Sequence, residues 1–457
     1  MIKFQNCKLR LTLAAQSPMI HFQGESEGAT LRGSELKPKL DRFLNEKIRE
    51  LIDKGEIDKR EIAYIDKERD ALKYRVSIQG SQKGCRYCLD QEQKPRNFTI
   101  IYADRQNKVL LLRDFELTIL CMNLSLQKLI EKYIVEFFAV TNFGYMQNKG
   151  FGSFMPREYM QNTRPDQIRK DAAKWVKKKC EAKNCYYMDF SNGSNSKRKE
   201  ELLEYNCFFK EIKDFYDLLK TGKNFNGEYS RAYIYQYMHM KDIDNEKAWL
   251  KVKGIAPALK SVAGGNRVKE KKLSGIDSRN AKYVRALLGL SPKLEYLNSC
   301  DRKKSREKVI IKINDEKDEI ARTASPIFFK IIGNFVFICA DRIQKEIYGK
   351  SFSFKAVVKH PYSGYSENYN DSLAIQDRET RRGSLFVPSE EELNEKNITI
   401  DDLLEHYVRF YNGEESGEKN GERLRPKAGC QARENERIKY ALSQSLRKNK
   451  YVKNCEL

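Results

Sequence analysis

The chain has 457 residues, of which 40% are hydrophobic and 11% aromatic; this much apolar material needs packed cores, which excludes a globally disordered protein. Lys and Arg number 86 against 64 Asp and Glu, so the formal net charge is +22. Such an excess predicts a polyanionic partner, most commonly nucleic acid, although a protein that docks onto acidic neighbours would also be basic.

The first third of the chain predicts an α+β unit in the order strand, helix, strand, strand, helix. Leu9, Leu11 and Leu13 alternate with polar residues, as in a strand with one buried face. Apolar residues from Leu36 to Leu51 recur every three or four positions, as on one side of a helix. The predicted elements are a strand at 3–13, a helix from Ser34, paired strands at 97–104 and 108–120, and a helix at 125–140. This order suits a ferredoxin-like (RRM-like) domain, whose last strand we expect near Phe151 or later in the chain.

The rest of the chain predicts a basic helical segment and a second α+β unit. Residues 163–220 are mainly helical and basic, and two apolar strands flank the turn Gly333-Asn334. The further predicted elements are strands at 308–313, 324–332 and 334–340 and a helix at 401–411. We therefore predict an α+β fold with two ferredoxin-like domains and a basic, mainly helical insertion. The predicted division is a first domain at 1–160, the insertion at 161–300, a second domain at 301–412 and a basic tail at 413–457.

The first candidate RNA-binding segment is the loop that leads into the predicted first helix. Arg32 and Gly33 precede this helix, and Lys37 and Lys39 lie in its first turns. A helix N-terminus offers unpaired N–H groups and the positive end of the helix dipole to a phosphate. Gly33 lets a backbone approach closely, and Ser34 is expected to cap the helix. We predict that these five residues hold an RNA backbone.

A second candidate is the glycine-containing loop with the sequence Lys149-Gly150-Phe151-Gly152. Backbone N–H groups of such a loop can wrap a polyanion, and the Phe151 ring can stack on a base. The alternative is a tight turn whose aromatic ring only packs inside the protein. Taken together with the first candidate segment, this loop is better explained by RNA binding than by packing alone.

These two segments resemble the RAMP superfamily of CRISPR-associated proteins. In that superfamily an early strand leads through a Ser-Pro stretch into a loop and helix similar to residues 17–40 here. A glycine-rich loop similar to residues 148–153 lies near the end of the first ferredoxin-like domain. Residues 283–290 and 324–330 also resemble family segments. The resemblance is closest to the two-domain RAMP subunit of Cmr-type (type III-B) effector complexes.

The resemblance implies an RNA-binding subunit of a CRISPR effector ribonucleoprotein with a role in antiviral defence. Its partners would be single-stranded guide RNA, with target RNA as a further ligand, and other effector subunits. Contacts would go mainly to phosphates and 2′-hydroxyls, so we expect no cofactor and no catalytic residue.

One alternative is a metal-independent endoribonuclease that processes guide RNA. His21 lies beside the first candidate segment and could act as general base on a 2′-hydroxyl. No second catalytic group is evident, so a binding role is favoured.

Cysteine spacing and hydropathy bear on metal binding and location. The 11 cysteines are an odd number at irregular spacing, and the start of the chain has no apolar segment of a secretory signal. No run approaches the roughly 20 apolar residues of a membrane span. We therefore expect a cytoplasmic protein with reduced thiols and no bound metal. Zinc at Cys85 and Cys88, with Cys180 and Cys185 as a looser second pair, is the alternative.

Overall fold

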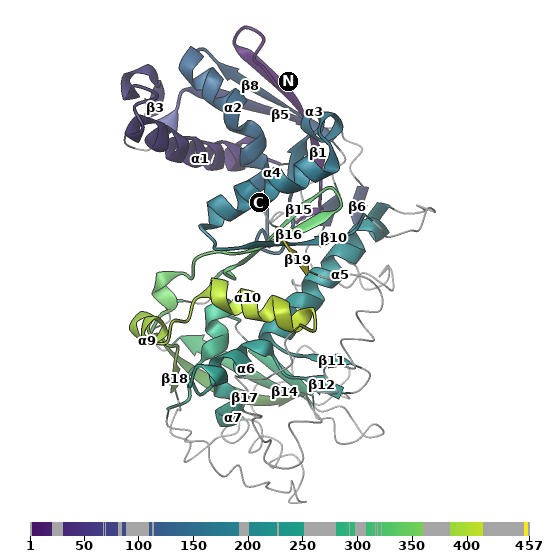
Figure 1. The fold of residues 1–457 in the computed structure, drawn as a ribbon, viewed down its shortest axis with the longest axis vertical. Coiled ribbons are helices and arrows are strands. Elements are labelled where there is room, and N and C mark those ends of the chain that lie inside the picture. The colour runs from purple at the N-terminus through teal and green to yellow at the C-terminus, as the bar shows by residue number, and fades with distance from the viewer. Residues whose placement is uncertain are drawn as a thin grey trace, which may run out of the picture. The chain divides into compact units, whose positions relative to one another are not determined.

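The computed structural model describes residues 2–20, 31–66, 68, 70–80, 85–87, 109–111, 114–191, 201–225, 228–250, 280–291, 293–297, 308–315, 317, 319–320, 322–359, 384–414 and 452–455. These residues form an α+β protein whose named strands pair in antiparallel sheets (Figure 1).

The chain divides into two compact units, and each unit joins segments that are distant in sequence. Unit 1 contains Met1–Phe215, Ile327–Asp341 and Leu442–Leu457, and unit 2 contains Tyr216–Pro326 and Arg342–Ala441. The division into continuous segments at residues 160, 300 and 412 stays a prediction. None of the helices in the described ranges combines the length and apolar composition needed to cross a bilayer.

The first sheet of unit 1 confirms the predicted first strand and both predicted helices. Its strands are β1 (Lys8–Ala15), β5 (Tyr74–Gly80), β8 (Asp114–Cys121) and β9 (Phe154–Pro156), in the spatial order β5-β8-β1-β9. Leu9, Leu11 and Leu13 are at most 3% exposed and share a core with helices α1 (Gly33–Asp53) and α2 (Leu124–Val140).

Of the two predicted paired strands, the structure describes only part of the second, at 108–120. The predicted strand at 97–104 lies outside the described residues. The neighbours of β8 are β1 and β5, and β5 was not predicted. The short strands of unit 1 are β2 (Met19–Ile20), β6 (Cys85–Tyr87), β7 (Val109–Leu111), β3 (Tyr64–Asp66) and β4 (Ala71–Leu72).

The second sheet of unit 1 is built around the predicted apolar strand pair. Strands β15 (Ile327–Ile332) and β16 (Phe335–Ala340) are buried throughout and flank Gly333, which has a φ of +56°. The sheet is completed by β10 (Cys185–Asp189) and β19 (Val452–Asn454), in the order β15-β16-β10-β19. The other helices are α3 (Arg157–Asn162), α4 (Pro165–Cys180) and α5 (Glu201–Lys220), and α5 continues into unit 2.

Unit 2 contains a third four-stranded sheet and a set of short helices. The sheet has the order β13-β14-β17-β18, and a separate hairpin joins β11 to β12. Their bounds are β11 (Lys223–Phe225), β12 (Glu228–Ser230), β13 (Lys293–Leu297), β14 (Lys308–Asp315), β17 (Ser351–Lys359) and β18 (Ser384–Phe386). The helices are α6 (Tyr233–Met240), α7 (Glu246–Leu250), α9 (Glu390–Glu395) and α10 (Ile400–Tyr411), with a 3-10 helix at Val284–Leu288. Strand β14 and helix α10 confirm the predictions at 308–313 and 401–411.

Because unit 2 contains a buried lysine, Lys220, we expect the free energy of unfolding to rise with pH above pH 7. The Lys220 ammonium donates to the Gly289 carbonyl, and burial, with Arg285 adding to it, lowers the pKa of Lys220 to about 7. Between pH 7 and about 10 the unfolded chain therefore holds a proton that the folded chain lacks, so the free energy of unfolding rises by up to about 1.4 kcal/mol per pH unit. Lys220→Met should flatten this rise. Urea unfolding of both proteins between pH 7 and pH 9 measures it, and equal slopes would contradict the assignment.

Candidate nucleic-acid interface

The start of α1 presents exposed polar groups. Arg32 is the N-cap residue and makes no capping hydrogen bond with its side chain, and the helix begins at Gly33. Ser34 lies inside the helix, so the prediction that Ser34 caps it is wrong: the turn into the helix occurs two residues earlier than that role requires. Both Arg32 and Ser34 are exposed, and among the described residues the atom nearest to a Cβ added at Gly33 is Val76 O, at 3.7 Å. The start of this helix therefore lies at the surface, and its positive dipole end favours an anion there.

Lys37 faces the inside of the unit rather than the open start of the helix. Its Nζ lies 2.5 Å from Asp41 Oδ2 and 3.1 Å from the Leu72 carbonyl oxygen. The same ammonium sits 4.4 Å from the centre of the Tyr74 ring, and 23% of the side chain remains exposed. Reaching a phosphate would require Lys37 to leave these contacts.

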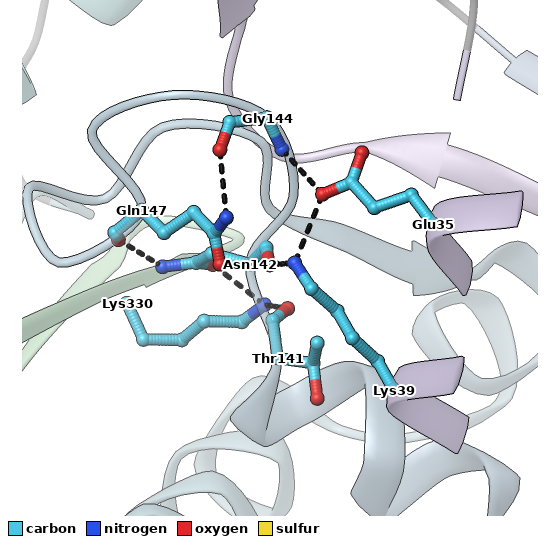
Figure 2. Close-up of polar contacts among 7 residues, drawn as sticks. All are labelled: Glu35, Lys39, Thr141, Asn142, Gly144, Gln147 and Lys330. Carbon is cyan, nitrogen blue, oxygen red and sulfur yellow. Dashed lines mark hydrogen bonds and ion pairs between the residues drawn. The ribbon is translucent and has the colours of Figure 1, made fainter. Parts of the chain in front are cut away.

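Lys39 fastens α1 to the loop that follows α2. Its Nζ donates to Glu35 Oε1, the Asn142 carbonyl and Gln147 Oε1, each at 2.9 Å (Figure 2). Burial lowers the pKa of Lys39, with its hydrogen bond to Glu35 opposing the shift. These three acceptors satisfy the ammonium, so Lys39 stabilises the contact between α1 and the loop.

The loop at 141–153 is held together by side chains that the sequence analysis did not single out. Glu35 accepts from the Gly144 N–H at 2.9 Å, and Asn142 Nδ2 donates to the carbonyl of Gln147 at 2.7 Å (Figure 2). The Lys330 ammonium, with its residue fully buried, donates to the Thr141 carbonyl at 2.7 Å and to Asn142 Oδ1 at 3.0 Å. Burial lowers the pKa of Lys330 well below its usual value. The one sequence signal was a lysine inside an otherwise apolar strand.

The two glycines of the candidate loop already use their N–H groups inside the protein. Gly150 N–H donates to the Gln147 carbonyl at 3.1 Å, and Gly152 N–H donates to the Pro18 carbonyl at 2.8 Å. Ser17 Oγ in turn donates to the Gly150 carbonyl at 2.6 Å. In this conformation both glycine N–H groups are hydrogen-bonded within the protein, so the predicted wrapping of a polyanion would require them to leave these carbonyls.

The Phe151 ring lies in the core of unit 1. It is 1% exposed and stacks on Phe209, with ring centres 4.1 Å apart and an interplanar angle of 23°. This position speaks against the expectation that Phe151 stacks on a base, because the ring would first have to leave Phe209. Lys149 pairs with Phe329 as an isolated bridge residue, and its Nζ lies 5.8 Å from the Phe329 ring centre.

The loop therefore joins the two sheets of unit 1. Ser153 Oγ donates to the Ile331 carbonyl of β15 at 2.6 Å, and its N–H donates to Ser17 Oγ, just beyond β1, at 2.9 Å. The Phe329 N–H donates to the Asn148 carbonyl at 3.0 Å. Of the nine predicted site residues, the structure leaves Arg32 and Ser34 exposed and brings Lys39 against the glycine loop.

The alternatives that the sequence raised fall largely outside the described residues. His21 and Cys88 are not described, so neither the endoribonuclease nor the zinc knuckle is tested. Within the described ranges, no group of three or more His, Cys, Asp or Glu side chains is arranged to hold a metal ion. Cys180 is buried and hydrogen-bonds with Cys339, and that bond together with burial raises the pKa of its thiol.

Comparison with protein families gives two matches that together span most of the chain. A model described as the Cmr1 N-terminal domain matches residues 6–223, and one described as the Cmr1 C-terminal domain matches residues 229–428. The first match contains both candidate segments. A search of curated proteins found no match.

Proposed function

This chain belongs to the Cmr1 family of two-domain CRISPR RAMP proteins, and from that premise we propose that it binds single-stranded guide RNA. Cmr1 domains indicate a subunit of the type III-B CRISPR effector complex, which contains further protein subunits. The proposed role is to hold the RNA backbone within that complex in antiviral defence, in the cytoplasm and without catalysis by this chain.

The observation that carries the proposal is the exposed start of α1, at Arg32 and Ser34, in a strongly basic protein. A helix of 21 residues begins without a side-chain cap, next to the exposed Arg32, in a chain with a net charge of +22. The positive end of the helix dipole and a neighbouring guanidinium together favour a phosphate, and further phosphates then add salt-dependent affinity.

We assign the predicted site residues two different roles. Arg32, Gly33 and Ser34 contact the RNA backbone directly, because they lie at the start of the helix, where Arg32 and Ser34 are exposed. The remaining six keep that end and the adjoining loop in shape: Lys37, Lys39, Lys149, Gly150, Phe151 and Gly152. The support for this second role is their contacts within unit 1, described above, and Lys37 keeps enough exposure to add charge near the RNA.

We also propose that the first domain is ferredoxin-like. The chain order β1-α1-β5-β8-α2-β9 is the strand–helix–strand–strand–helix–strand order of that fold, and the strands lie in one antiparallel sheet. The match to the Cmr1 C-terminal domain supports a second domain, and the ferredoxin-like fold of that domain stays a prediction.

Single-stranded RNA binding by the purified chain tests the proposal. We expect log affinity to fall with log salt concentration by about 0.7 per phosphate contacted. Arg32→Glu should weaken binding about tenfold, or about 1.4 kcal/mol, and make the salt dependence shallower. The matched control is Arg49→Glu on the same helix, whose side chain is 67% exposed and pairs with Asp70. An affinity that does not respond to salt, or equal losses in the two variants, would contradict the proposed site.

A further inference from the structure

Large hydrophobic side chains are exposed at one corner of unit 1. The exposed fractions are 63% for Ile65, 36% for Leu120, 78% for Met122 and 71% for Leu124. Among the described residues only Phe386, in unit 2, is a further exposed large hydrophobic. Scattered single apolar residues are normal on a soluble protein, whereas several together are typical of a surface that meets another molecule.

These side chains belong to elements that are fixed to one another. Met122 and Leu124 flank Asn123, whose side chain accepts from the Leu126 N–H at 2.7 Å and donates to the Glu61 carbonyl at 2.8 Å. The cap thus holds the start of α2 against the segment that leads into β3, which carries Ile65. Exposure of Met122 and Leu124 is therefore built into the fold of this connection.

Positive charge borders the same corner on the open face of the first sheet. Leu120 lies directly opposite Lys8 on one neighbouring strand and opposite Arg75 on the other. Directly opposite residues in an antiparallel sheet share a face and lie about 5 Å apart. Lys8 and Arg75 are both exposed, and within the described part of the chain neither forms an ion pair. Arg10 follows two residues after Lys8 on the same face.

The composition of this face favours a protein partner over RNA. Sheets that bind single-stranded RNA commonly stack bases on aromatic side chains of the open face. On the described strands the residues that share the face with Leu120 include no aromatic one: Lys8, Arg10, Thr12, Ala14, Arg75, Ser77, Gln79, Asp114, Glu116, Thr118 and Met155. Burying leucine and methionine side chains against apolar surface is energetically favourable, and a phosphate backbone offers no such surface. The flexible methionine side chain also adapts readily to the shape of a protein surface.

We propose that this corner, formed by Ile65, Leu120, Met122 and Leu124 and bordered by Lys8, Arg10 and Arg75, docks another protein subunit. The occupant is a segment with apolar side chains flanked by carboxylates. An apolar centre with a charged rim is the usual anatomy of a protein interface, and the cations select an acidic partner and speed its approach. The proposal goes beyond RNA binding and does not depend on it.

A double variant, Met122→Asp with Leu124→Asp, tests the apolar centre in the full-length chain. Both side chains are largely exposed, so the isolated protein should keep its melting temperature and its RNA affinity. When the chain is coexpressed with the other subunits of its effector complex and purified through a tag, recovery of the docked subunit should fall at least about tenfold. Phe386→Asp, at a side chain 55% exposed in unit 2, is the matched control and should leave recovery unchanged.

Two further measurements identify the occupant. A benzophenone amino acid at Met122 should cross-link, in the assembled complex, to a protein segment rich in Asp or Glu. Lys8→Glu with Arg75→Glu should reduce recovery of the same subunit, and more strongly at low salt, where charges act furthest. Normal recovery in the folded Met122 and Leu124 variant would overturn the proposal. So would cross-links to RNA, to a second copy of this chain or to a segment without carboxylates. RNA affinity lost in the charge variant with normal recovery would assign this face to RNA instead.

Discussion

Gly152→Ala should prevent stable folding of unit 1. Gly152 has a φ of +69°, and a Cβ there would lie 1.8 Å from the Phe143 carbonyl oxygen and 2.7 Å from the carbonyl carbon. Both atoms are backbone, so no side-chain rotation relieves the clash. Moving the backbone would break the hydrogen bond from Phe143 N–H to the Gly152 carbonyl. We expect a loss of more than about 4 kcal/mol in the free energy of unfolding, seen as insoluble or protease-sensitive protein.

The matched control for this prediction is Gly55→Ala. Gly55 also has a φ of +69°, but a Cβ there would meet nothing within 4 Å. Only the left-handed backbone conformation is then penalised, at about 1–2 kcal/mol. Thermal melting and limited proteolysis of the two variants separate the clash from the backbone effect. Similar behaviour of the two proteins would mean that the loop around Gly152 can rearrange freely.

Phe151→Ala should destabilise unit 1 before it affects RNA binding. The ring is buried and stacked on Phe209, and truncating a buried Phe typically costs about 3–5 kcal/mol. Phe151→Leu keeps most of the volume and should cost less than half as much. Urea unfolding of the full-length chain gives the differences, and RNA affinity is then measured only under conditions where each variant is folded.

Phe386→Ala is the control for Phe151→Ala. Its side chain is 55% exposed, so truncation should change the free energy of unfolding by no more than about 0.5 kcal/mol. A different result would support the base-stacking role that the sequence predicted for Phe151. Unchanged stability in Phe151→Ala, together with RNA affinity weakened by roughly 1–3 kcal/mol, would mean that this ring stacks on a base.

Hydrogen bonds join the loop at 141–153 both to α1 and to the rest of unit 1. The N–H groups of Gly150 and Gly152 donate hydrogen bonds to the carbonyls of Gln147 and Pro18. Lys39, on α1, donates hydrogen bonds to the same loop. The loop thus connects the start of α1 to both sheets of unit 1. If Arg32 binds RNA as proposed, a variant in this loop is expected to weaken RNA binding by displacing Arg32 rather than by removing a contact. Stability therefore has to be measured beside affinity.

The sequence by itself determined the elements whose pattern is local. Alternation of Leu9, Leu11 and Leu13 predicted β1, the spacing from Leu36 to Leu51 predicted α1, and the apolar pair around Gly333 predicted the hairpin β15–β16. Each pattern records which face of one element is buried, and that face is fixed by residues a few positions apart. The net charge and the family resemblance were equally readable without a structure.

Tertiary structure alone decided which segments meet. Strands β10 and β19 complete the sheet of β15 and β16, although each lies more than a hundred residues away along the chain. Strands this short have too few residues for their sequence pattern to predict which strand they pair with. The same holds for the candidate site. The contacts of a lysine and the burial of a phenylalanine depend on which residues pack beside them. Lys39 binds the loop through Gln147, and Phe151 is buried against Phe209. Both partners come close only when the chain folds, so the sequence alone did not indicate these roles.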